Sequence, residues 1–127
     1  MVNIIKEFKD KKSHYFFGYY DKSNISYDNT LILSNKANFN DKFPNSSDKL
    51  EIGYFHISSG KFKKISKTET WNWQEGCMLQ FYQNFAGKTI TIIFNKILNQ
   101  ELISEICDLN GTILHICPFP VAAVNSK

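Results

Sequence analysis

The chain contains no arginine: its 15 basic residues are all lysine, set against 12 acidic residues for a formal net charge of +3. Without a guanidinium group, it lacks the planar fork that binds phosphate or carboxylate through two hydrogen bonds. An anion site must therefore be built from lysine, side-chain amides or backbone N–H groups. No block of five or more like charges occurs either, and this scatter predicts no interaction with nucleic acid.

Long apolar runs are also missing. No stretch approaches the roughly 18 consecutive apolar residues that a membrane-spanning helix needs. Residues 1–12 carry charges at positions where a signal peptide would need an apolar segment. These two absences predict a cytoplasmic protein without a membrane span.

Cysteine is scarce, and the three that occur are Cys77, Cys107 and Cys117. Their odd number and wide spacing lack the close pairs that zinc and redox motifs require, so neither a metal site nor a cofactor is predicted. A two-residue turn at 110–111 would place Cys107 opposite Leu114 and Cys117 opposite Ser104. That register disfavours a disulfide between these cysteines and predicts three reduced, mostly buried thiols.

Aromatic residues, by contrast, are abundant: they make up 15% of the chain, with 11 Phe and 6 Tyr. These residues favour strands over helices. Short β-type segments separated by turn residues follow one another, and no window carries a sustained helical apolar period. The predicted strands are Leu31–Ser34, Leu50–Ile57, Phe62–Ser66, Met78–Tyr82, Thr89–Asn95, Leu102–Leu109 and Thr112–Cys117. This density of strands is typical of an all-β domain.

The sequence repeats itself. Ile52–Ser66 aligns without a gap on Ile103–Cys117, and the glycine of each hairpin turn coincides. Apolar positions coincide as well, for example Phe55 with Ile106. Each copy therefore predicts one β-hairpin with a turn of the Ser-Gly or Asn-Gly type at its tip.

A matching strand precedes each hairpin. Leu31–Lys36 matches Thr91–Lys96, and both segments end in Asn-Lys. Adding Met78–Tyr82 ahead of the second copy gives four antiparallel strands per unit, which is the blade of a β-propeller. A β-sandwich of two similar sheets is the alternative interpretation. The apolar run Val121–Val124 predicts the first, innermost strand of a third blade.

We therefore expect an all-β chain whose antiparallel four-stranded blades form an incomplete β-propeller. Residues 1–127 would form its N-terminal part, with blade 1 at about 13–67, blade 2 at about 71–117 and the start of blade 3 at 118–127. Propellers close with about four to eight blades. Two blades alone are expected to be marginally stable, because an open array exposes strand edges and an uncovered sheet face.

Two motifs concentrate bulky and polar side chains at the start of the units. They are His14–Ser23 (HYFFGYYDKS) and Trp71–Gln80 (WNWQEGCMLQ), and we expect them to be neighbours at one end of the propeller channel. They resemble the paired signatures of a family of bacterial WD40-like or TolB-like propeller proteins. Members of this family are often encoded among genes for cell-surface polysaccharide synthesis. The resemblance covers essentially the whole chain and about the first third of a family member.

A more distant resemblance in blade pattern is to oligogalacturonate lyases. It implies a cluster of metal-binding histidines together with arginine. This chain has no arginine, and its three histidines are His14, His56 and His115. The lyase chemistry is therefore incomplete in these residues, and the two histidines of the hairpins are read as ordinary strand residues.

The motifs contain the side chains that a glycan site requires. Aromatic faces stack on sugar rings, while amides and charged groups bind sugar hydroxyls. The predicted substrate-binding residues are Tyr19, Tyr20, Lys22, Trp71, Asn72, Trp73 and Gln74. The alternative is that the aromatic residues wedge between adjacent blades.

No reaction follows from the sequence, although three catalytic candidates can be named. His14 could be a general base or a ligand, the two usual functional roles of an imidazole, and it shares its motif with Asp21. Glu75 could act with Asp21 as a carboxylate pair in glycosidic chemistry. For His14 the alternative is a structural role that binds a neighbouring loop or blade.

Three functions are consistent with these patterns. The first is a glycan-binding or glycan-processing propeller in bacterial cell-surface polysaccharide biosynthesis, whose partner is an oligosaccharide or a nucleotide-sugar pathway intermediate. The second is a WD40-like protein-interaction scaffold. The third is an inactive, truncated remnant of a longer propeller gene. A further expected partner is a chain that supplies the missing blades.

Overall fold

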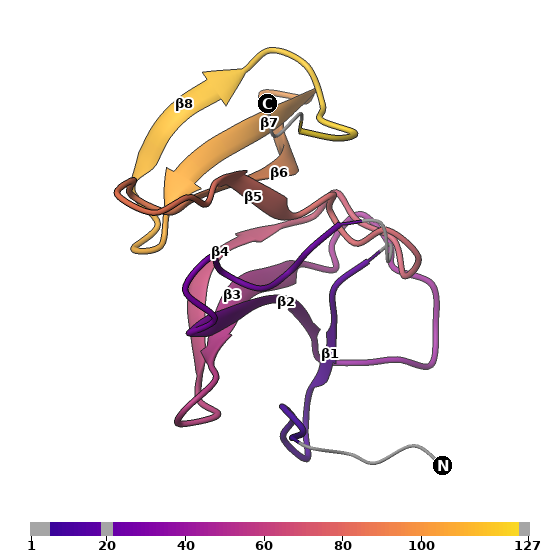
Figure 1. Cartoon of the computed structure of the whole chain (residues 1–127). Coiled ribbons are helices and arrows are strands. Elements are labelled where there is room, and N and C mark those ends of the chain that lie inside the picture. Colours follow the sequence, from indigo (N-terminus) through magenta and orange to yellow (C-terminus); the bar gives the residue numbers. More distant parts are fainter. Residues whose placement is uncertain (1–5, 19–21, 125–127) are drawn as a thin grey trace.

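The computed structural model of the protein describes residues 6–18 and 22–124, which form two four-stranded antiparallel sheets and no helix. Sheet 1 consists of β1 (His14–Phe16), β2 (Leu31–Ala37), β3 (Leu50–His56) and β4 (Phe62–Thr68). Sheet 2 consists of β5 (Gln80–Gln83), β6 (Thr91–Leu98), β7 (Glu101–Asp108) and β8 (Ile113–Cys117). Figure 1 shows the two sheets as separate layers. The prediction of an all-β chain with four antiparallel strands per unit is confirmed.

All seven predicted strands are present, but several ends differ. β2 continues to Ala37, beyond the predicted end at Ser34. β5 begins at Gln80 rather than at the predicted Met78, because Met78 has a left-handed backbone with φ of +59° that no regular strand accommodates. β1 lies inside the first motif and is not among the seven predicted strands.

The gapless alignment of the two hairpins is wrong along β3 and β7. Asn35 of β2 pairs with Ile52, whereas the equivalent Asn95 of β6 pairs with Ser104. Ile52 therefore corresponds to Ser104 and not to Ile103. A slip of one residue moves every side chain to the opposite face of a sheet, so the predicted apolar coincidences along these strands do not describe one shared face.

Turn length explains the slip. Phe55 pairs with Phe62 across the first hairpin, and the structurally equivalent Cys107 pairs with Ile113 across the second, so the first turn is one residue longer. Cys107 consequently faces Ile113 and not Leu114, because the second turn is not the predicted two-residue type. The backbone N–H of residue 108 donates to the carbonyl of residue 112 at 3.1 Å.

The predicted position of Cys117 is confirmed: it pairs with Ser104. Cys77 and Cys107 are buried, Cys117 is half-buried, and all three are free thiols. Burial raises the pKa of Cys77 to about 12. For Cys107, burial together with the nearby Glu105 charge also raises the pKa to about 12. Both buried thiols therefore stay protonated and unreactive at neutral pH.

The hydrophobic core lies between the two sheets. Alternating residues of β2 and β3 face alternating residues of sheet 2, which is the period-two pattern of strands that each bury one face. The fully buried apolar side chains are Leu33, Leu50, Ile52, Leu79, Ile92, Phe94, Cys77 and Cys107. Full burial of a large apolar side chain contributes roughly 1.5–3 kcal/mol, so this layer is the main source of stability.

The repeated Asn-Lys pair places a buried amide in each sheet. The Asn35 side chain donates to the Phe17 carbonyl at 2.6 Å and accepts from the Cys77 thiol at 3.5 Å. The Asn95 side chain donates to the Val121 carbonyl at 3.1 Å and accepts from the Val121 N–H at 2.7 Å. Buried amides need such partners. Each asparagine thus fastens a neighbouring segment to its sheet.

Two further contacts join the sheets directly. The buried Thr68 hydroxyl, at the end of β4, donates to the Asn95 carbonyl of β6 at 2.8 Å. The Asn84 side chain, which follows β5, donates to the Ile25 carbonyl at 3.2 Å and accepts from the Tyr27 N–H at 2.8 Å. The two sheets are therefore connected by polar contacts as well as by the core.

Val121–Val124 does not form the predicted strand. Its backbone is held by side chains: Asn95 binds Val121, and the Gln80 Oε1 atom accepts from the Val124 N–H at 2.9 Å. A strand requires a paired backbone neighbour. Because side chains occupy these backbone groups, the segment lies against sheet 2 without entering it.

The segment before β1 is anchored by a carboxylate. The Asp10 side chain accepts from the Tyr15 hydroxyl at 2.6 Å and from the N–H groups of Lys12 and Ser13. These bonds lower the pKa of Asp10 to about 2, and the bond from Tyr15 has the largest effect. Burial and the Asp10 contact raise the pKa of Tyr15 to about 12. The Tyr15 ring also packs on Phe55 at 4.8 Å between ring centroids.

Replacing a core aromatic side chain tests the position of the core. Phe94→Ala is expected to lower the free energy of unfolding by about 3–5 kcal/mol, because Phe94 is fully buried between the sheets. Phe43→Ala is the control, since Phe43 is 88% exposed and its loss should change stability by less than about 0.5 kcal/mol. Urea unfolding followed by circular dichroism measures both. Similar losses of unfolding free energy in the two variants would contradict the position of the core between the sheets.

The Asp10–Tyr15 contact predicts a pH dependence. A carboxyl whose pKa is lower in the folded state stabilises the fold above its ordinary value of 3.8 and loses that effect as pH falls towards about 2. Tyr15→Phe should therefore lower the urea midpoint at pH 7, and its difference from wild type should shrink between pH 4 and 2. Tyr27→Phe, at an exposed tyrosine, is the control. A difference that is constant with pH would contradict the role of Asp10.

Candidate functional site

The two motifs are neighbours, as the sequence predicts. A Cβ atom at Gly18 would lie 2.9 Å from the Glu75 carbonyl oxygen, so only glycine allows this approach. The rings of His14 and Trp73 also meet, with centroids 5.5 Å apart. His14 and Gly18 of the first motif therefore form one continuous region with the turn of the second motif, beside β1.

Both tryptophans of the second motif hold the loop between β2 and β3. The Trp71 indole N–H donates to the Asp48 carbonyl at 2.9 Å, and the Trp73 indole N–H donates to the Lys42 carbonyl at 2.7 Å. A buried or half-buried indole normally finds such a partner. These bonds position loop 38–49 over the motif region.

The indole rings form an aromatic cluster. Trp71 and Trp73 meet edge to face at 4.9 Å, and Phe16 and Phe39 each contact both of them. Such geometry matches the alternative in which the aromatic residues fill space within the fold. The stacking of sugars on these two tryptophans stays a prediction.

The remaining motif residues have local roles or lie elsewhere. The Asn72 side-chain oxygen accepts from the N–H groups of Gln74 and Glu75 at 2.9 and 2.8 Å, so Asn72 shapes the turn. Gln74 is exposed, and Glu75 is half-buried. His14 is exposed and contacts the aromatic cluster through its ring. The candidates Tyr19, Tyr20 and Asp21 lie outside the described residues.

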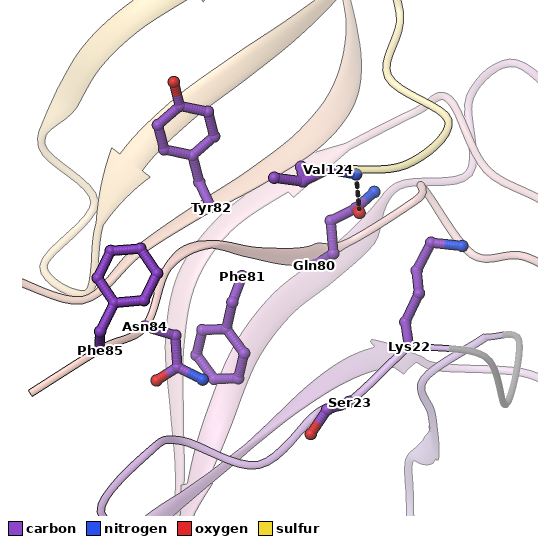
Figure 2. A pocket seen from close by; sticks show the side chains of 8 residues that line it. All are labelled: Lys22, Ser23, Gln80, Phe81, Tyr82, Asn84, Phe85 and Val124. Atoms are coloured by element: carbon purple, nitrogen blue, oxygen red, sulfur yellow. Dashed lines mark hydrogen bonds between the residues drawn. The ribbon is translucent and has the colours of Figure 1, made fainter. Parts of the chain in front are cut away.

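A pocket of about 360 Å³ opens where the two motifs end (Figure 2). Lys22 and Ser23 close the first motif, and Gln80 closes the second. The remaining walls come from β5, the loop after it and Val124. The complete lining is Lys22, Ser23, Gln80, Phe81, Tyr82, Asn84, Phe85 and Val124.

The pocket combines apolar rings with polar groups. Tyr82 and Phe85 are large side chains that remain about half exposed there. Figure 2 shows Lys22 on one side of the space and Phe85 and Tyr82 on the other. Asn84 is held in place by its bonds to the loop before β2. The site can thus present aromatic surface, an ammonium group and a hydroxyl to one ligand.

Sequence reasoning identified Lys22 but missed Tyr82, Asn84 and Phe85. These residues follow the second motif directly, so an extension of that motif by five residues would have included them. No periodicity marks them, because the backbone pairing between β5 and β6 shifts register between Phe81 and Gln83. That bulge changes which side chains share a face.

A second hollow of about 310 Å³ lies on the loop that the tryptophans hold. It is lined by Asn40, Asp41, Lys42, Phe43 and Trp73. Lys42 forms an ion pair with Asp48 at 2.8 Å, and its ammonium lies 4.5 Å from the Phe39 ring centroid. Trp73 is the predicted substrate-binding residue that borders this hollow.

Comparisons with protein-family models, with curated proteins and with solved structures gave no match. In the part of the chain that the structure describes, no three His, Cys, Asp or Glu side chains come together as metal ligands could. Over the same residues, no helix could cross a membrane.

Removing one indole N–H tests the loop anchor. Trp73→Phe keeps an aromatic ring but deletes the bond to the Lys42 carbonyl, which contributes about 1 kcal/mol. Trypsin should then cut after Lys42 about fivefold faster, because the loop leaves the motif region more often. Cleavage after Lys61, in the turn between β3 and β4, serves as the internal control. Equal rates at Lys42 in both proteins would contradict the anchor.

Proposed function

We propose that the protein is a carbohydrate-binding propeller protein of cell-surface polysaccharide assembly. We assign to the pocket at Lys22, Tyr82 and Phe85 the binding of a sugar that carries an acidic group. The observation that carries this proposal is the placement of exposed aromatic rings and a lysine around one pocket at the junction of the two motifs.

The propeller assignment is supported by the likeness of the two sheets. Both have four antiparallel strands in chain order, and they stack through a shared apolar core. Asn35 and Asn95 occupy equivalent positions and fasten neighbouring segments in both sheets. Consecutive blades of a propeller are related in this way.

The pocket chemistry supports an acidic sugar. Phe85 and Tyr82 offer apolar rings for the C–H faces of a sugar, and the Ser23 hydroxyl can bind a sugar hydroxyl. Because the chain has no arginine, Lys22 is the residue of the pocket that supplies positive charge. A volume of about 360 Å³ is within the range of small-ligand pockets.

The biological context rests on the resemblance of the motifs to propeller proteins encoded with polysaccharide genes. An oligosaccharide containing a hexuronic acid, or a nucleotide sugar, meets the requirement for an acidic group beside a sugar ring. Neither His14 nor Glu75 lines the pocket. The proposal is therefore binding, and it assigns no reaction to these residues.

Substitution of Lys22 tests the charge. Lys22→Met should weaken binding of a uronic-acid oligosaccharide about 10- to 100-fold, because a hydrogen bond to a charged group contributes about 1.5–3 kcal/mol. Binding of a neutral oligosaccharide should change little. Isothermal titration calorimetry at low salt measures both affinities. Lys88→Met, at an exposed lysine in the turn after β5, is the matched control.

Phe85→Ala, measured in the same titrations, tests whether the aromatic ring contacts the sugar. This change should weaken the acidic and the neutral sugar alike, whereas Phe43→Ala, at the other hollow, should weaken neither. Wild-type protein that binds no oligosaccharide at millimolar concentration would overturn the proposal. Loss of binding in Phe43→Ala alone would place the sugar on loop 38–49 instead.

A further inference from the structure

A polar hollow of about 200 Å³ lies between the segment before β1 and the start of loop 38–49. Its lining contains two lysines and a histidine, and no aspartate or glutamate. A concave surface of this composition offers hydrogen-bond donors and attracts anions. The complete lining is Lys11, Lys12, Ser13, His14, Asn38, Phe39 and Asn40.

A bend at residues 11–12 brings two consecutive lysines to the same hollow. In an extended strand, consecutive side chains would point to opposite sides. The Asp10 carboxylate fixes the bend, because it accepts from the N–H groups of Lys12 and Ser13 at 2.9 and 2.7 Å. It also accepts from the Tyr15 hydroxyl at 2.6 Å. The carboxylate is engaged in these bonds and is not part of the lining.

The opposite wall is held against β1 by strand pairing and by the tryptophans of the second motif. Ala37, the last residue of β2, pairs with His14, so Asn38 follows directly beside β1. The Phe39 ring packs on the indoles of Trp71 and Trp73 at 5.8 and 5.5 Å between ring centroids. Because both walls are held by other contacts, an anion would bind without the cost of ordering them.

The donors of the hollow are not used elsewhere in the part of the chain that the structure describes. Neither Lys11 nor Lys12 forms an ion pair with another described residue, unlike Lys9 and Lys42. Two adjacent ammonium groups repel each other until an anion with about two negative charges neutralises both. A phosphate group carries about −1.5 to −2 at pH 7, whereas a carboxylate carries one charge.

We propose that this hollow binds a phosphate group, as a site separate from the sugar pocket. Lys11 and Lys12 supply the charge, and lysine binds phosphate in this way in many proteins. The His14 ring N–H and the side-chain amides of Asn38 and Asn40 bind the phosphate oxygens. A volume of about 200 Å³ is below the roughly 300–1,000 Å³ of pockets that enclose whole small molecules, so any group esterified to the phosphate lies outside the hollow.

This site is independent of the proposed sugar site, because the two linings share no residue. Heteronuclear NMR of the isotopically labelled full chain resolves them in one spectrum. Phosphate should shift the amide resonances of residues 11–14 and 38–40, whereas an oligosaccharide should shift those of residues 80–85. Failure of either proposal therefore leaves the other to be judged by its own resonances.

Titration with inorganic phosphate tests the ligand class. The shifts at residues 11–14 and 38–40 should saturate at millimolar phosphate, and sodium acetate at matched ionic strength should bind more weakly because acetate carries one charge. Methyl phosphate distinguishes the two sources of the group. Equal or tighter binding of methyl phosphate would show that the site takes an esterified phosphate, and its exclusion would assign the site to free phosphate.

Substitution tests the assigned donors. Lys11→Met/Lys12→Met should weaken phosphate binding by about tenfold or more, because bonds between charged groups are the strong ones. Lys61→Met/Lys88→Met is the matched control, since it removes the same charge from two exposed lysines in other turns. His14→Phe keeps an aromatic ring beside Trp73 but deletes the ring N–H, and it should weaken binding about fivefold.

Three results would overturn the proposal. The first is the lack of a saturable shift at residues 11–14 and 38–40 with either phosphate. The second is equal weakening in the two double variants, because binding would then follow net charge rather than this hollow. The third is acetate binding as tight as phosphate binding, which would exclude recognition of a doubly charged group.

Discussion

The buried side-chain amide of Asn35 is the interaction on which the arrangement of both motifs depends. It lies in an apolar core and must be satisfied by protein groups, because an unpaired buried amide is costly. Phe17 and Cys77 supply the partners. A Cβ atom at Gly76 would lie 2.6 Å from the Asn35 amide nitrogen, so the second motif needs glycine to approach. One amide thereby sets the distance between two segments far apart in sequence.

The candidate site follows from that constraint. The second motif is held beside the first, and β5 begins only after its turn, at Gln80. The residues that follow β5 therefore lie in the same pocket as Lys22. The tryptophans of the same motif donate their indole N–H groups to carbonyl groups of loop 38–49. A single motif therefore shapes the pocket through its end and restrains a loop through its beginning.

The two sheets share a topology but differ on their surfaces. Sheet 1 carries lysines along its edge strand β4 and is covered on one side by the aromatic contacts of Phe8 and Tyr15 with Phe55. Sheet 2 has a neutral apolar edge. Internal repetition thus specifies the backbone plan, while the exposed positions of each copy are free to differ because burial does not constrain them.

The order of polar and apolar residues was sufficient to predict an all-β chain and its strand positions, because these depend on local period and turn signals. The contact of the motifs was predicted from the repeated unit, which puts each motif at the start of a sheet. The pairing of Cys117 with Ser104 was predicted from a turn that is wrong, and it holds because the register shift between Ile106 and Cys107 compensates for the different turn. The hairpin register was not predictable, since one extra turn residue before Phe62 leaves no mark in a gapless alignment yet exchanges the faces of a strand. The roles of the tryptophans and of Phe85 also needed the three-dimensional fold. Which partner an indole N–H finds, and which ring stays exposed, depend on segments that only packing brings together.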